Sequence, residues 1–135
     1  MYNKNNIELC KMRLAKAEDC MKKALKNLAI EDYDIAANRS YYAIFHAMRA
    51  LNALEDVDFK HHSGVISHFR KTYIKTHIFE SELSNIITNA FDMRQFCDYD
   101  DYYNISPMEV EAQVRNAEFF LNNVKFYINK QLNEE

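Results

Sequence analysis

The chain has 135 residues, of which 48% are hydrophobic and 27% charged, a balance typical of one folded globular domain over residues 1–135. With one Gly and one Pro, it has too few turn-forming residues for a sheet protein, so the composition predicts an all-α fold. The net charge of −3 excludes a general polyanion binder that relies on bulk charge.

The cysteine pattern and the hydropathy both bear on location. Cys10, Cys20 and Cys97 are an odd number without a CxxC spacing, which is typical of reduced thiols. The chain starts with polar residues and holds no apolar run of 18 residues, so we expect neither secretion nor insertion into a membrane. We therefore expect a cytoplasmic protein.

Residues 7–28 carry apolar side chains in a heptad pattern, which predicts a long amphipathic helix with a narrow seam. The seam residues are Ile7, Cys10, Leu14, Ala17, Met21, Ala24 and Leu28. The opposite face carries Lys11, Lys16, Lys22, Lys23 and Lys26. Surface charge needs no partner to explain it, so we interpret this face as a solvated surface.

Residues 33–54 predict a second helix with two different faces. One face holds small residues that allow a neighbouring helix to approach closely: Ala36, Ser40, Ala43, Ala47 and Ala50. The other face carries Arg39, Tyr42, His46 and Arg49 at a 3-4-3 spacing. On a helix, Arg39 and His46 lie roughly 20° apart around the axis and about 10 Å apart along it.

An arginine and a histidine so placed could act on one phosphodiester. The guanidinium would bind the phosphate, and the imidazole would move a proton near neutral pH without a metal. The alternative is that His46 is a core histidine bonded within the bundle, with Arg39 at its rim.

Three further helices are expected. A short one follows Phe59–Gly64, with Val65, Ile66, Phe69, Tyr73 and Ile74 facing inward. Another begins near Ser81 and ends in the acidic, tyrosine-rich cluster at residues 98–103. Ser106-Pro107-Met108-Glu109 is a helix start with Ser at the N-cap, Pro at the first helical position and Glu at the capping-box position. The expected architecture is an up-and-down antiparallel four-helix bundle plus one short extra helix.

Three segments together resemble the HEPN superfamily. Asn38-Arg39-Ser40-Tyr41-Tyr42-Ala43-Ile44-Phe45-His46 resembles its signature helix, in which Arg is followed by four to six residues and then His; here the gap is six. Lys60-His61-His62-Ser63-Gly64 resembles the K-x-H-S-G-type segment of a small bacterial and archaeal HEPN group. Arg94-x-x-x-Asp98-Tyr99 resembles that group's R-x-x-x-D-Y segment. The resemblance covers roughly residues 7–130.

The resemblance implies a homodimer with a composite cleft and metal-independent cleavage of RNA. Arg39 would hold the scissile phosphate, and His46 would be the acid/base. The RNA 2′-hydroxyl would attack, which excludes DNA. The resemblance also implies a toxin or defence protein, with a minimal nucleotidyltransferase as a possible antitoxin. Supporting or RNA-binding roles are assigned to Asn38, Tyr42, Arg49, Lys60, His61 and His62.

One position departs from the toxins that are regulated by adenylylation. Those toxins carry a Tyr two residues after the His, where this chain has Met48, so adenylylation at that position is not supported. The alternative function is a catalytically silent HEPN module that docks a nucleotidyltransferase or binds a nucleotide.

The remaining candidates are weaker, and no cofactor or metal is expected. A metal site would combine His61, His62 and His68 with Asp98, Asp100 and Asp101, but the chain has no i,i+4 His pair. Arg94 and Asp98 are interpreted as an intrahelical ion pair. Three tyrosines could stack on bases, although we favour a dimer interface for them: Tyr99, Tyr102 and Tyr103.

Overall fold

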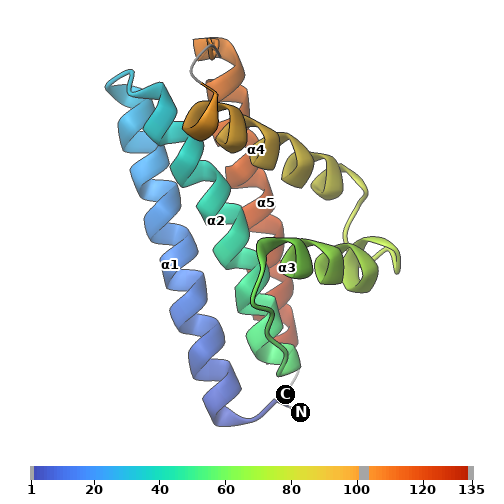
Figure 1. Ribbon diagram of the computed structural model, residues 1–135. Coiled ribbons are helices and arrows are strands. Elements are labelled where there is room, and N and C mark those ends of the chain that lie inside the picture. The colour runs from blue at the N-terminus through green and yellow to red at the C-terminus, as the bar shows by residue number, and fades with distance from the viewer. Residues whose placement is uncertain (1, 101–103, 134–135) are drawn as a thin grey trace.

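The computed structural model describes residues 2–100 and 104–133, and every regular element in these ranges is helical (Figure 1). The all-α fold is therefore confirmed. In chain order the elements are α1 (Lys4–Ala29), α2 (Tyr33–Glu55), α3 (His62–Phe69), the π-helical turn η1 (Arg70–Ile74), α4 (Glu82–Tyr99) and α5 (Pro107–Asn133).

The three longest helices run beside one another, with α3 and α4 inclined across them (Figure 1). Helix α1 runs opposite to α2, and the amino and carboxyl ends of the chain lie at the same end of the molecule. No helix in the described ranges combines the length and the apolar character that crossing a membrane requires. Side chains of α3 and α4 line a pocket between these two helices.

Helix α2 is the centre of the fold and packs against α1, α3, α4 and α5. Its small face is completely buried, as Ser40, Ala43, Ala47 and Ala50 show. Of the helix pairs, α1 and α2 make the most extensive contact, as expected for a helix that carries a face of small residues. Close packing of α1 on α2 also brings side chains of α1 next to the polar face of α2.

The helix ends explain how the chain turns with a single glycine. The Asn3 side chain accepts a hydrogen bond from the Asn6 backbone N–H at 2.8 Å, which caps α1. Helix α5 begins at Pro107, as the Ser-Pro sequence predicts. Glu31, Asp56 and His77 adopt positive φ angles of 62°, 59° and 63°. Non-glycine residues therefore occupy the left-handed turn positions where Gly is usual.

Some sequence-based interpretations fall outside the described ranges. Asp101, Tyr102 and Tyr103 lie there, so the metal and interface alternatives that include them rest on sequence alone. Tyr99, at the end of α4, is described and is 73% exposed. It is therefore available for contact with another molecule.

Candidate active site

Arg39 and His46 lie along one face of α2, with Tyr42 between them. The Arg39 guanidinium carbon is 5.1 Å from the centre of the Tyr42 ring, which is a cation–π distance. The Tyr42 and His46 rings are 6.0 Å apart between their centres. All three side chains are half-buried. Contacts thus run from Arg39 through Tyr42 to His46, and Arg49 lies one helical turn further along α2. We call these four residues the Arg–His face (Arg39, Tyr42, His46 and Arg49).

Asn38 holds the Arg39 side chain in place. Both Nη2 and Nε of Arg39 donate to Oδ1 of Asn38, at 2.6 and 3.0 Å. The Asn38 amide donates to Oδ2 of Asp98 on α4 at 3.4 Å. Since an amide oxygen accepts without neutralising the guanidinium, Arg39 keeps its full charge and has N–H groups left for a ligand.

The predicted ion pair between Arg94 and Asp98 is present, and Arg94 does more than stiffen α4. Its Nε lies 3.5 Å from Oδ2 of Asp98, an ion-pair distance without a hydrogen bond. The Arg94 guanidinium carbon also lies 5.2 Å from the Tyr41 ring centre and 5.4 Å from that of Tyr42. Arg94 therefore connects α4 to the aromatic side chains of α2.

His62, at the start of α3, is also joined to α2. Its Nδ1 is 2.9 Å from the hydroxyl of Tyr41, and its ring stacks on Phe45 with centres 4.0 Å apart. Burial lowers the pKa of His62, and the nearby Arg94 and Arg49 lower it further. The neutral ring is thus held at the edge of the Arg–His face.

His46 has the most perturbed titration among the histidines at this site. Burial is the main cause, and positive charge on Lys16, Arg49 and Arg39 adds to it; together they lower the pKa of His46 to about 4. Within the described residues, Nδ1 of His46 is buried and has no hydrogen-bond partner. Burial and these cations disfavour the protonated imidazole, whereas an anion bound beside His46 would favour it. With an anion in place, the neutral imidazole can accept a proton.

Helix α1 also contributes side chains to the site, which its own sequence pattern did not indicate. Because α1 runs antiparallel to α2, Cys20 lies opposite Arg39, and Arg13 lies opposite Arg49. Arg39 Nη1 contacts Sγ of Cys20 at 3.9 Å, and Arg13 Nη1 donates to the Arg49 carbonyl oxygen at 3.0 Å. Lys16, interpreted above as merely solvated, is near enough to lower the pKa of His46. These contacts depend on how α1 packs against α2, which the pattern within either helix does not show.

The predicted site residues do not all converge. Lys60 and His61 are exposed, and no hydrogen bond or ion pair of the described residues joins either of them to Arg39 or His46. His68 instead contacts Glu55, with Nε2 3.0 Å from Oε1. In the described part of the chain, no three His, Cys, Asp or Glu side chains are close enough to share a metal ion.

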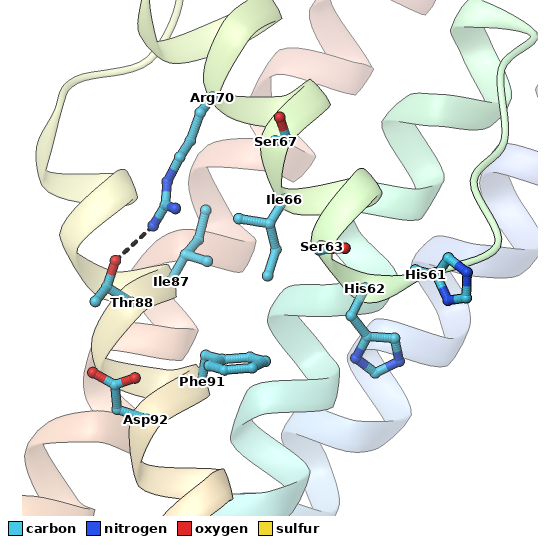
Figure 2. Close-up of a pocket in the computed structure, with 10 residues that line it drawn as sticks. All are labelled: His61, His62, Ser63, Ile66, Ser67, Arg70, Ile87, Thr88, Phe91 and Asp92. Atoms are coloured by element: carbon cyan, nitrogen blue, oxygen red, sulfur yellow. Dashed lines mark hydrogen bonds between the residues drawn. The ribbon is translucent and has the colours of Figure 1, made fainter.

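A pocket of about 650 Å³ lies between α3 and α4, and His62 is one of the residues that line it (Figure 2). Figure 2 shows Arg70 reaching across to Thr88, where Nη2 donates to Oγ1 at 2.6 Å. Ile66, Ile87 and Phe91 make the apolar part of the lining. An apolar lining with a few polar groups is typical of small-molecule sites, and periodicity gave no sign of it.

Comparison with known proteins identifies the family. The HEPN domain family model matches residues 10–127, which include the Arg–His face, His62, Arg94 and Asp98. The chain belongs to the HEPN family.

Relatives of this HEPN protein are found in archaea and bacteria. A protein of Methanocaldococcus jannaschii named "Putative toxin MJ0142" is 35% identical over 115 residues, which cover 85% of this chain and 78% of that protein. "Putative toxin MJ0605" of the same organism is 34% identical over 95 residues, or 69% of each chain. A Thermotoga maritima "UPF0332 protein" is 31% identical over 110 residues, covering 82% of this chain and 83% of its own length. Two of these three relatives thus carry a name that refers to a toxin, and the third does not.

Proposed function

We propose that this HEPN protein is a metal-independent endoribonuclease and the toxin or defence component of a toxin–antitoxin pair. The observation that supports this most strongly is the Arg–His face itself. It places a fully charged guanidinium and a neutral imidazole on either side of one aromatic ring. The two relatives named "Putative toxin" support the biological role.

The reaction follows from the two side chains. Arg39 binds the non-bridging oxygens of the scissile phosphate, and its charge stabilises the negative charge that grows there. Neutral His46 takes the proton from the RNA 2′-hydroxyl as that oxygen bonds to phosphorus. The P–O5′ bond breaks, and the proton held by His46 passes to the leaving 5′-oxygen. The products are a 2′,3′-cyclic phosphate and a 5′-hydroxyl.

Some of the supporting residues lie next to Arg39 and His46 on α2, and others lie in the loop before α3. Asn38 positions Arg39, while Tyr42 and Arg49 extend the binding face. Lys60 and His61 are exposed in the loop before α3, where they could reach a longer RNA. His62 borders the site through Tyr41 and Phe45.

The proposal includes a symmetric homodimer in which two Arg–His faces share one cleft. A minimal nucleotidyltransferase is the proposed antitoxin partner. Static light scattering on the purified chain at tens of micromolar should give twice the 16.0 kDa of one chain. A monomer at every concentration would remove the shared cleft.

Cleavage is tested by incubating the purified protein with a labelled single-stranded RNA. The wild-type protein should give fragments that end in a cyclic phosphate, and His46→Ala should give none. If intact RNA remains under all conditions while the protein is folded and dimeric, the endoribonuclease proposal fails.

The pocket between α3 and α4 favours a second candidate function, that of a catalytically silent HEPN module that binds a nucleotide. Arg70 and the apolar side chains Ile87 and Phe91 could hold a phosphate and a base, respectively. Calorimetric titration with nucleoside triphosphates tests this directly. Binding that Arg70→Gln removes, together with no RNA cleavage, would favour the silent module.

A further inference from the structure

Asp58 occupies the position of an anion beside two arginines. Its Oδ2 is 3.5 Å from Nη2 of Arg13 on α1, and its Oδ1 is 3.7 Å from Nη2 of Arg49 on α2. A single carboxylate therefore joins two guanidinium groups that come from different helices. Both distances are longer than those of a tight charged hydrogen bond, which indicates a weak hold on Asp58.

The two arginines are built into the fold, whereas Asp58 is at the surface. The Arg13 side chain is 11% exposed, that of Arg49 is 27% exposed, and that of Asp58 is 59% exposed. Arg13 is fixed by its bond to the Arg49 carbonyl oxygen at 3.0 Å. An exposed carboxylate on a loop can move away at little cost, while the guanidinium groups stay where they are.

Arg13 extends the Arg–His face, because it lies beside Arg49, the last residue of that face. Arg49 is one helical turn beyond His46, so its side chain is a neighbour of the imidazole on the helix surface. Arg49 comes ten positions after Arg39, which corresponds to about 15 Å along α2. That length exceeds what one phosphate group needs and fits a strand that continues past the scissile bond.

We propose that Arg13 and Arg49 form a second phosphate-binding site, next to the reacting phosphate, and that Asp58 fills it until RNA binds. This inference rests on the proposed ribonuclease function and adds Arg13 of α1 to the RNA-binding surface. The RNA phosphate replaces the Asp58 carboxylate between the two guanidinium groups. Asp58 thus competes with the substrate and lowers its affinity.

The test measures the affinity of the full-length protein for a 2′-O-methylated RNA oligonucleotide, which binds without being cleaved. In the wild-type chain the Phe59 backbone N–H donates to Oδ1 of Asp58 at 2.9 Å. Asp58→Asn keeps an oxygen for this bond but removes the negative charge that competes with the RNA phosphate. It should tighten binding by about fivefold. Arg13→Gln should weaken binding by about tenfold and reduce the slope of log K against log salt by roughly 0.7. Arg13→Lys should recover most of the affinity.

Matched controls come from α5, where Arg115 and Glu111 form an exposed ion pair at 3.9 Å. Arg115→Gln and Glu111→Gln make the same changes in net charge as the test variants, and their affinities should stay close to wild type. Melting curves check that each variant is folded. If Arg13→Gln is unfolded, the Arg13→Lys and Asp58→Asn affinities still decide the question.

The outcomes separate this inference from the function on which it rests. If unmodified RNA is cleaved while Asp58→Asn and Arg13→Gln bind like the controls, the second phosphate site is wrong and the ribonuclease proposal stands. If the affinities change as stated but no RNA is cleaved, the site is supported and the catalytic proposal fails. If neither wild type nor Asp58→Asn binds RNA, both are wrong.

Discussion

Oδ1 of Asn38 accepts two hydrogen bonds from the neighbouring Arg39, from Nη2 at 2.6 Å and from Nε at 3.0 Å. Through its amide, Asn38 also reaches Asp98 on α4 at 3.4 Å. The side chain proposed to hold the scissile phosphate is thus fixed by the residue before it and, through that residue, by a different helix. Asn38 is therefore a positioning residue. Without its side chain, Arg39 would keep its charge, but the guanidinium would no longer be held in one orientation.

Asn38→Ala should therefore lower the turnover of RNA about tenfold while changing the KM less, because orientation matters most in the transition state. Steady-state kinetics on a short RNA measure both constants. Asn123→Ala on α5 is the matched control, since the Asn123 amide donates to the Phe119 carbonyl oxygen of its own helix, at 2.9 Å. A fall in activity of the same size in both variants would contradict the positioning role.

Substitutions of the two central residues should affect binding and turnover differently. His46→Ala should abolish cleavage with little change in RNA affinity, because a neutral imidazole contributes little to phosphate binding. Arg39→Ala should reduce both, and Arg39→Lys should recover affinity better than turnover because a point charge replaces the bidentate fork. Affinity and single-turnover rates measured on the same RNA check this. If His46→Ala unfolds the protein and the wild-type protein shows no RNA binding, His46 is a core histidine and the silent binding module is the better account.

The titration of His46 makes stability depend on pH. In the folded chain its pKa is about 4, against an ordinary value of 6.5. Between these values the unfolded chain binds more protons, so the free energy of unfolding decreases as the pH falls from about 6.5 to about 4. Because the ring is only half-buried, we expect a loss of about 1–2 kcal/mol.

Urea unfolding at several pH values measures this effect. His46→Gln should flatten the decrease between pH 6.5 and 4 in part, because the lowered pKa of His62 acts in the same direction. A pH dependence that is the same in His46→Gln and wild type would show that His46 titrates normally in the folded chain.

The turn after α2 offers a stabilising change. Asp56 has φ 59° and ψ 42°, a left-handed conformation that glycine adopts without steric cost. Asp56→Gly should raise the free energy of unfolding by about 1 kcal/mol. Asp92→Gly within α4 should lower it by about 1 kcal/mol, since glycine is unfavourable inside a helix. Chemical denaturation compares the two variants, and equal signs would contradict the argument.

Local sequence patterns predicted the helices well. The second helix was expected over residues 33–54 and is observed as Tyr33–Glu55, and the last helix begins at the expected Pro107. These boundaries depend on capping residues and on apolar periodicity, which are properties of neighbouring positions in the chain. The stripe of Arg39, Tyr42 and His46 could be predicted for the same reason.

Relationships between helices could not be predicted in this way. The proximity of Arg13 to Arg49, the bond between Tyr41 and His62, and the tilt of α4 depend on how separate helices pack. Packing is decided by side-chain shapes over the whole core, and periodicity within one segment does not contain that information. The lysine face of α1 was therefore interpreted only as a solvated surface.

The most direct test of the central claim compares two oligonucleotides in EDTA: a single-stranded RNA, and the same sequence with 2′-deoxy nucleotides throughout. In the proposed mechanism, Arg39 and His46 need no metal, and the attacking group is the 2′-hydroxyl. The protein should therefore cleave the RNA at an undiminished rate and leave the deoxy strand intact. Loss of RNA cleavage in EDTA, or equal cleavage of both strands, would contradict the mechanism.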